Sequence, residues 1–283
     1  MKIVPLFQDQ VASSDQEAIL VTHSDFFEEY FEVFGRKARF LDSIDEQIAA
    51  LDSEDLSLKV GRLEKGIKHA ARALESTLEP CPMPRCVVFI GEGSYDGMGL
   101  IMKDLPHFFV DLSLVQARLS ESSSFQLEIF LIHEALHGIH FSTSSEFYPR
   151  YYDTETDKYH RRMMTEGICA YLSARILGKT MESALWLGLV DDGVIHHWMG
   201  HCKEKKGPFG HAMQAAIRGE ADDVYLWYDL FGVRDMDNLA ESRAGYYYGY
   251  QIAVKLADAY GDERLLHLSY EEMKPHIDRY FAS

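Results

Sequence analysis

The chain has few cysteines, few prolines and a shortage of positive charge. Its 283 residues include 4 cysteines and 8 prolines, and 28 lysines and arginines stand against 45 acids, a formal net charge of −17. Four cysteines are too few to staple a chain of this length, so we expect reduced thiols in a cytoplasmic protein. The shortage of lysine and arginine argues against a nucleic-acid partner and against docking on an anionic membrane.

The chain also lacks a long apolar run. No segment approaches the roughly 18–20 uninterrupted apolar residues of a membrane-spanning helix. The first twenty residues carry one lysine and no sustained apolar stretch, which makes them a poor secretory signal. With 47% hydrophobic and 26% charged residues, the composition is that of an ordinary globular protein.

The spacing of apolar residues predicts helices over most of residues 1–80, where they recur at three- and four-residue intervals. Pro80, Pro82 and Pro84 then mark a break in the pattern. We therefore predict a helical N-terminal extension over residues 1–85, packed on a catalytic unit over residues 86–283.

A short β-rich region follows the prolines. The apolar runs 86–91, 99–103 and 107–114 predict a small mixed sheet. The glycines between the first two runs have no helix directly after them, so they predict a flexible hairpin loop and not a phosphate-binding loop.

From about residue 121 the pattern is helical again. Strong amphipathic helices are predicted over 125–141, 158–177 and 244–260, and shorter helical pieces separated by loops over 181–231. The predicted fold class is α+β, mostly helical, with the small sheet next to the helix that carries the motif described below.

That motif is His133-Glu134-Ala135-Leu136-His137, an H-E-x-x-H segment. Residues four apart lie on one face of a helix, so both imidazoles can reach one zinc ion at about 2.0–2.1 Å. Glu134 projects beside them, where it can accept a proton from water without being a ligand. The alternative is a patch of polar side chains on the surface of a half-buried helix.

A catalytic zinc site needs a third protein ligand and an open position for water. Metzincins would place glycine at position 140 and histidine at position 143, but this chain has His140 and Thr143. Glu166 lies among apolar and small residues on a later predicted helix, and Gly167 beside it allows a close approach of backbone or metal. The alternative for Glu166 is a solvated acid on a helix face.

Three motifs together resemble the gluzincin metallopeptidases, and most of all an uncharacterised group of zinc-dependent proteases with a G-Y-x-x-G-Y segment. They are the H-E-x-x-H segment, the segment Glu166-Gly167-Ile168-Cys169-Ala170, which departs from E-G-[LIV]-A by one inserted cysteine, and 245–250, Gly-Tyr-Tyr-Tyr-Gly-Tyr. The resemblance covers roughly residues 86–260. It implies a zincin-like fold and hydrolysis of peptide bonds in a peptide or protein substrate.

The resemblance also implies roles for individual residues. His133, His137 and Glu166 would be the Zn²⁺ ligands, and Glu134 the general base. Tyr250 is our candidate donor to the oxyanion, with Tyr246 as its neighbour one turn earlier. An aromatic packing stripe is the alternative for these tyrosines. The run 107–114 is the candidate edge strand for pairing with substrate backbone, and a core strand is the alternative, which is compatible with that role.

Other histidines leave alternatives open. His140 could be a surrogate ligand, His160 precedes Glu166, and four more histidines cluster in a region predicted to be rich in loops: His196, His197, His201 and His211. Two histidines and a carboxylate also suit a non-haem iron enzyme. A third possibility is a non-catalytic protein that holds zinc or senses peptides, in which four protein ligands would close the site.

Overall fold

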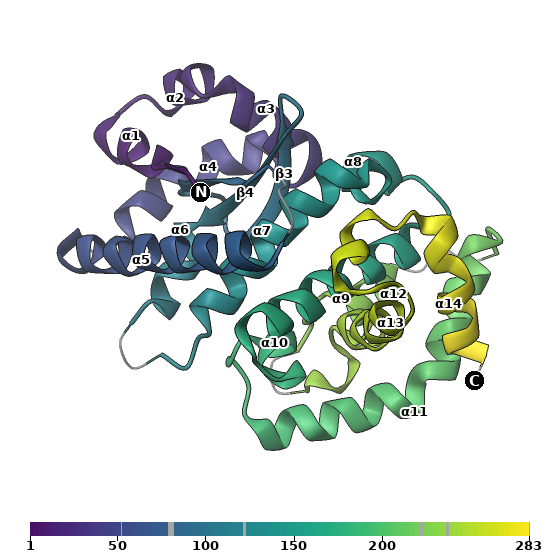
Figure 1. The fold of residues 1–283 in the computed structure, drawn as a ribbon. Coiled ribbons are helices and arrows are strands. Elements are labelled where there is room, and N and C mark those ends of the chain that lie inside the picture. Colours follow the sequence, from purple (N-terminus) through teal and green to yellow (C-terminus); the bar gives the residue numbers. More distant parts are fainter. Residues whose placement is uncertain (52, 79–81, 121–122, 221–223, 236–237, 283) are drawn as a thin grey trace. The chain divides into compact units, whose positions relative to one another are not determined.

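The computed structural model describes residues 1–51, 53–78, 82–120, 123–220, 224–235 and 238–282 (Figure 1). By its internal contacts the chain forms two compact units, Met1–Ser142 and Thr143–Ser283. In the sequence, Cys81 and Cys86 could close a small metal or disulfide loop, and Ser122, Ser123 or Ser124 could cap the following helix. Cys81 and Ser122 lie outside the described residues.

The first unit contains a mixed sheet of four strands. They are β1 (Ile3–Val4), β2 (Arg85–Phe89), β3 (Gly97–Met102) and β4 (Leu105–Asp111), in the order β1-β2-β4-β3. The first two pairings in this order are parallel, and β3 pairs with β4 antiparallel. Lys103 and Asp104 join β3 to β4 with φ of 51° and 60°, the left-handed backbone of a two-residue hairpin turn.

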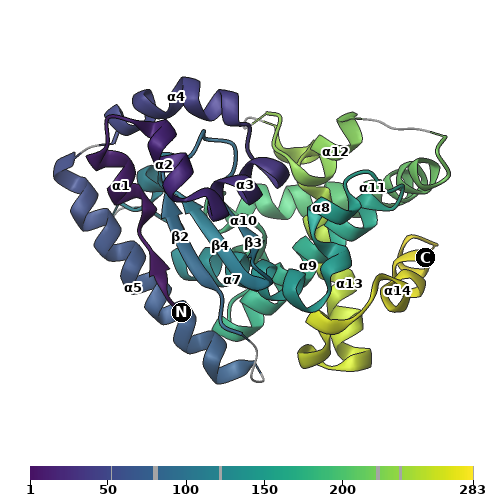
Figure 2. The same ribbon diagram turned by 90° about the horizontal axis from the view of Figure 1, so that it is seen from above.

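Helices surround this sheet in the first unit (Figures 1 and 2). They are α1 (Leu6–Ala12), α2 (Gln16–Thr22), α3 (Ser24–Val33), α4 (Lys37–Ala49), α5 (Ser53–Thr77), α6 (Leu112–Val115) and α7 (Leu127–Thr143). Phe26 and Tyr30 of α3 pack on Phe89 and Phe109, with ring centroids 4.9–6.4 Å apart. These edge-to-face contacts stabilise one face of the sheet.

Helix α7 packs on the opposite face of the sheet, and two glycines allow its close approach. A Cβ atom on Gly99 of β3 would collide with the backbone of α7 at Gly138, and a Cβ atom on Gly138 would collide with the carbonyl oxygen of His107 in β4. The helix and the strands are therefore in contact through their backbones. Because the H-E-x-x-H segment ends one residue before Gly138, this contact fixes its position on the sheet.

The second unit is helical. Its elements are α8 (Pro149–Tyr152), α9 (Lys158–Leu177), α10 (Met181–Trp186), α11 (Asp192–Ile217), α12 (Val224–Phe231), α13 (Ala244–Tyr260) and α14 (Tyr270–Ala282). Helices α9 and α13 cross at Gly167 and Gly249, where a Cβ atom on either residue would collide with backbone of the other helix. Gly167 thus permits a helix crossing, which is one of the close approaches expected of it.

The α+β prediction is confirmed, because the chain is mostly helical with a small mixed sheet. Residues 1–85 contribute β1 to that sheet and belong to the same compact unit as β2–β4. Whether they act as a separable extension of a catalytic unit at 86–283 stays a prediction, as does the zincin-like character of the fold.

Three local predictions were wrong. Gly97 and Gly99 belong to strand β3 and not to a flexible loop. The run 107–114 is not an edge strand, since β4 pairs with β2 on one side and β3 on the other. The region predicted as loops with short helices contains one 26-residue helix, α11.

Two further predictions concern the whole chain. In the described residues we find no helix with both the length and the apolar character needed to cross a membrane. Cys86, Cys169 and Cys202 are free and buried. The thiol pKa of Cys86 is raised by burial, which keeps it in its protonated form.

Candidate metal site

The H-E-x-x-H segment lies in the middle of α7, and the helix is buried from Ile129 to Phe141. His137 is fully buried, while His133 and Glu134 are each 7% exposed. These exposures rule out the alternative of a polar surface patch. Apolar neighbours on every side explain why this helix packs inside the protein instead of lying on its surface.

His133 and His137 point their ring nitrogens at one another. Their Nε2 atoms are 3.0 Å apart, with ring centroids 4.7 Å apart and an angle of 80° between ring planes. Two nitrogens that each lie 2.0–2.1 Å from a tetrahedral zinc ion stand roughly 3.3 Å apart. The imidazole pair therefore has close to the separation that two ligands of one metal ion require.

Glu134 lies over strand β3 at Gly97. A Cβ atom at position 97 would stand 3.1 Å from Cγ of Glu134 and 2.8 Å from the carbonyl oxygen of Phe109. Glycine at this position leaves room for the Glu134 side chain between helix and strand. Nothing in the sequence connects these two residues, because the contact depends on how α7 packs on the sheet.

Glu166 lies on α9 and is fully buried, which rules out the alternative of a solvated acid. One turn earlier on the same helix, Nη2 of Arg162 lies 2.5 Å from Oε1 of Glu166. The side chains are 10% and 1% exposed, so the ion pair is buried. Burial raises the pKa of the neighbouring Tyr152, and the positive charge of Arg162 opposes that shift.

One group of side chains in the described residues could hold a metal ion: His133, His137 and Glu166. Each offers one ligand atom, all three residues are buried, and these atoms lie within 4.8 Å of one another. Two imidazole nitrogens and a carboxylate oxygen are the donor set of many catalytic zinc sites. The chemistry of the donors and the spacing of the histidines therefore fit a divalent metal.

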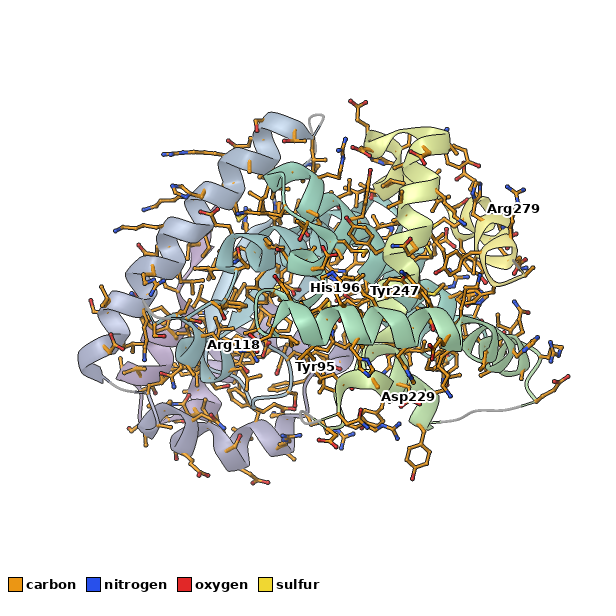
Figure 3. The ribbon with its side chains drawn as sticks, turned by 90° about the horizontal axis from the view of Figure 1, so that it is seen from below. Tyr95, Arg118, His196, Asp229, Tyr247 and Arg279 are labelled. Carbon is orange, nitrogen blue, oxygen red and sulfur yellow. The ribbon has the colours of Figure 1, made fainter. Side chains whose placement is uncertain are left out.

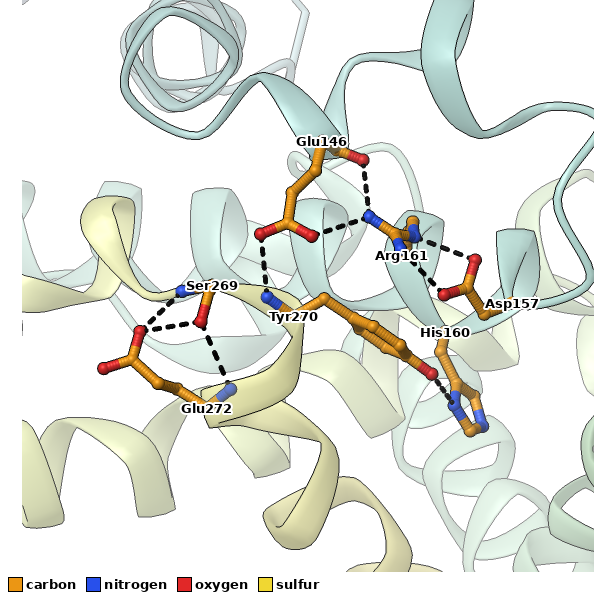
Figure 4. Close-up of polar contacts among 7 residues, drawn as sticks. All are labelled: Glu146, Asp157, His160, Arg161, Ser269, Tyr270 and Glu272. Atoms are coloured by element: carbon orange, nitrogen blue, oxygen red, sulfur yellow. Dashed lines mark hydrogen bonds and ion pairs between the residues drawn. The ribbon is translucent and has the colours of Figure 1, made fainter.

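His140 and His160, the nearest alternative ligands in sequence, are fully buried but do not belong to this group. His160 instead accepts or donates a hydrogen bond at Nδ1 with the hydroxyl of Tyr270, 3.1 Å away (Figure 4). Burial lowers the pKa of His160 to about 4, which keeps the ring neutral. His160 thus helps attach α14 to α9.

Figure 4 shows the rest of this attachment. Arg161 donates from Nε and Nη2 to the two carboxylate oxygens of Asp157, at 2.8 Å each, and from Nη1 to Glu146. The second oxygen of Glu146 accepts the backbone N–H of Tyr270 at 3.0 Å. This network holds the first residue of α14 against the beginning of α9.

The four histidines of the predicted cluster all lie on α11, and none belongs to the group that could hold a metal. Figure 3 labels His196 on this helix. His196, His197 and His211 are exposed, and His201 is half-buried. Nδ1 of His196 bonds to the carbonyl oxygen of Asp192 on its own helix, at 2.7 Å. A position on an exposed helix face accounts for His196, His197 and His211 without a ligand.

The tyrosines of α13 fall into two sets. Tyr247 and Tyr248 are buried packing residues: Tyr247 lies 5.9 Å from the ring of Trp198, and Tyr248 donates to the carbonyl oxygen of Cys202 at 2.8 Å. The guanidinium carbon of Arg243 lies over the ring of Tyr246, 4.0 Å from the ring centroid. The aromatic-stripe interpretation therefore holds for Tyr247 and Tyr248.

Tyr250 packs edge-on against Tyr171 of α9, with ring centroids 5.6 Å apart. Its pKa is raised by burial and by the charge of Glu182, so its hydroxyl keeps its proton. The crossing of α9 and α13 lies one residue after Glu166 and one residue before Tyr250. The roles assigned to Tyr250 and Tyr246 stay predictions.

Comparison with known proteins gives no match, neither to a family model, nor to a curated protein, nor to a solved structure. The chemistry of the site therefore rests on the residues themselves.

Proposed function

We propose that the chain is a zinc-dependent hydrolase, and that its substrates are peptides. The observation that carries this proposal is the buried group of His133, His137 and Glu166, with Glu134 between the two histidines in sequence. A bound zinc ion would polarise the scissile carbonyl and stabilise the negative charge that develops on its oxygen.

The protein side chains have distinct tasks in this proposal. His133, His137 and Glu166 hold the ion, and Glu134 takes the proton of the attacking water and passes it to the leaving amine. The position of Glu134 over Gly97 supports its role as a base, since the short approach between α7 and β3 restricts the carboxylate to one region. Tyr250 is the proposed hydrogen-bond donor to the oxyanion, which requires a protonated hydroxyl.

The strand proposed to pair with substrate backbone is now β3. It forms one edge of the sheet in the described residues, whereas β4 is enclosed by two neighbours. An extended peptide that adds to a sheet edge is held by main-chain hydrogen bonds, so it binds with little dependence on side chains. Strand β3 also contacts α7 directly at Gly99.

The proposal is tested by one substitution and one control on the same helix. Glu134→Gln removes the base and leaves the three ligands, so peptide hydrolysis should fall by at least about a hundredfold while the zinc content stays at that of the native chain. Glu128→Gln is the same chemical change on α7, at a residue whose carboxylate is half exposed and paired with His69 at 2.9 Å. It should keep both activity and zinc.

The identity of the metal is decided by elemental analysis of the purified chain. Zinc at one equivalent, lost in Glu166→Gln, supports the proposal. Iron at one equivalent with oxygen-dependent turnover would favour the non-haem iron enzyme, because the same donor set suits Fe(II). Bound zinc without hydrolysis of any peptide in a mixed library would favour a non-catalytic zinc protein.

A further inference from the structure

A second concave site lies at the end of the second unit, between α13 and α14. The hollow has a volume of about 320 Å³. Its lining residues come from the last turns of both helices: Lys255, Asp258, Ala259, His276, Arg279 and Tyr280. The catalytic proposal does not use any of them.

The hollow gathers positive charge in a chain whose formal net charge is −17. Lys255, Arg279 and, when protonated, His276 face a single acid, Asp258. Neither Lys255 nor Arg279 takes part in an ion pair with any residue in the described part of the chain. The mutual repulsion of these two exposed cations is therefore not offset by an ion pair, which leaves a local positive potential at the hollow.

The ring of Tyr280, which lines the hollow, has two lysine ammonium groups close to it. The ammonium of Lys255 lies 4.9 Å from the ring centroid of Tyr280, and that of Lys206, from α11, lies 5.1 Å from the same ring. Each contact is a favourable cation–π interaction, but together they bring two like charges to one ring. The pKa of His276 is lowered, first by burial and then by the charges of Arg279 and Lys255. The imidazole thus experiences the same positive potential.

We propose that this hollow binds a phosphate group, either as the free ion or on a small phosphate ester. A phosphate dianion supplies several acceptor oxygens in a tetrahedral arrangement, and can take hydrogen bonds from the guanidinium fork of Arg279, from Lys255 and from the imidazole at once. A carboxylate has one negative charge and two oxygens, and leaves part of this donor set unused. The phosphate class therefore fits the site better than the carboxylate class.

The hydroxyl of Tyr260 lies 3.5 Å from Nε2 of His276 and completes the set of polar groups around the imidazole. With Asp258, Lys255, Arg279 and Tyr280 of the two helices, and Lys206 of α11, it makes up the titratable and charged groups around the hollow in the described residues. A phosphate at the hollow would cancel the positive potential on His276. The imidazole is therefore a reporter of occupancy that lies inside the site.

The test is calorimetric titration of the chelator-treated 283-residue chain with inorganic phosphate, with glycerol phosphate and with acetate, at constant ionic strength. We expect saturable binding of both phosphates and none of acetate at the same concentration. Lys255→Gln and Arg279→Gln should each weaken phosphate binding by about tenfold or more. Tighter binding of glycerol phosphate would identify an ester as the source, and tighter binding of the inorganic ion would identify free phosphate.

Lys274→Gln is the matched control. It removes one positive charge from α14, at a lysine whose ammonium is already paired with Asp278 at 2.6 Å and does not line the hollow. An equal loss of affinity in this control would show a general effect of net charge and overturn the proposal. So would the absence of saturable phosphate binding, equal binding of acetate, or binding that requires added zinc.

A second measurement distinguishes a phosphate-binding site from a cluster of surface charges that binds nothing. The pKa of the His276 imidazole, followed by NMR, should rise when phosphate saturates the chain, because the anion favours the protonated ring. The ring resonances of the exposed His196 on α11, which does not line the hollow, should not respond to phosphate. A His276 pKa that does not respond to phosphate would overturn the proposal even if calorimetry showed heat.

Discussion

Arg162 and Glu166 form a buried ion pair one helical turn apart on α9, with Nη2 2.5 Å from Oε1. The same carboxylate belongs to the group that could hold a metal. In the metal-free chain the guanidinium is thus a countercharge for an acid that would otherwise be costly to bury. The pair could be recognised in the sequence as arginine and glutamate four residues apart, a spacing that places both on one helix face.

Removing one member of this pair should destabilise the metal-free chain strongly. Arg162→Gln leaves a buried carboxylate without its cation, and we expect the free energy of unfolding to fall by about 3–5 kcal/mol. In Arg162→Gln/Glu166→Gln the loss should be smaller than the sum of the two single losses, because no buried charge remains. Denaturant unfolding in the presence of chelator measures both.

The control for this cycle is the exposed pair of Arg218 and Glu220. Its members are 2.7 Å apart, but their side chains are 55% and 56% exposed. Arg218→Gln should leave the free energy of unfolding almost unchanged, since water screens the charges. A loss as large as that for Arg162→Gln would show that burial is not the cause of the difference.

Zinc should stabilise the native chain by binding its folded state. At a free zinc concentration of 100 times Kd, the gain is about 2.7 kcal/mol. His137→Gln should lose most of that gain, while His196→Gln, a substitution on the exposed face of α11, should retain it. The measurement is the difference in unfolding free energy between zinc-loaded and chelator-treated samples of each variant, so a change in basal stability cancels. Equal gains in both variants would argue against the proposed ligands.

Gly138→Ala should disrupt the seat of α7 on the sheet. The added methyl would meet the backbone of His107, which cannot move aside as a flexible side chain would. We expect a loss of stability of about 1–3 kcal/mol or more, as is usual for overpacking. Because the helix must shift, activity should fall as well.

Gly61→Ala provides the reference for that change. Gly61 lies in α5 of the same unit, and a Cβ atom there would meet nothing within 4 Å. The substitution should stabilise the chain by about 0.5–1 kcal/mol, because alanine has the higher helix propensity. If both variants changed stability in the same direction and by the same amount, the collision at position 138 would not be the cause.

Asp111 should make stability depend on pH. Its carboxylate accepts the backbone N–H groups of Gly91 and Ser113 at 2.8 and 2.9 Å, yet burial raises its pKa from 3.8 to about 6. The folded chain therefore binds this proton more tightly than the unfolded chain does. The contribution of Asp111 to stability is fully present below pH 3.8 and is lost as the pH rises through 6.

Asp111→Asn isolates this term. The unfolding free energy of the native chain minus that of the variant should decrease between about pH 4 and pH 7 and then become constant. Denaturant unfolding at several pH values measures the difference, in which contributions from the other acids cancel. A difference that does not change with pH would contradict the raised pKa of Asp111.

Local patterns in the sequence were enough to predict the helices and strands that carry the site. The periodic runs around His133, Glu166 and Tyr250 became α7, α9 and α13, because each helix has apolar residues at the spacing its packing requires. The same patterns could not show that β4 would be enclosed by two strands, since strand order depends on contacts between distant segments.

Helix α11 shows a different limit. Short helical pieces and loops were predicted for this region, yet Ile195, Trp198, Cys202 and Met213 form a buried stripe at helical spacing. Burial of that stripe stabilises the helix by more than the low helix propensity of the glycines destabilises it, because propensity is a weak effect compared with packing. At the site itself, the contact between Gly97 and Glu134 could not be predicted from the sequence for a similar reason. It forms only when α7 packs on β3.

The backbone contact between α7 and the sheet has a mechanical consequence. A helix advances 1.5 Å and turns by about 100° per residue, so a screw displacement of α7 by one residue would bring the side chain of His137 or Ile139 onto the His107 carbonyl, where glycine now fits. The helix therefore has a single permitted register on the strands. Changes of volume elsewhere in the core can be absorbed by rotation of side chains, but they cannot be relayed into a gradual displacement of the two imidazoles. The backbone contact at Gly138 therefore determines where His133 and His137 lie on the sheet, whatever the packing of other core side chains.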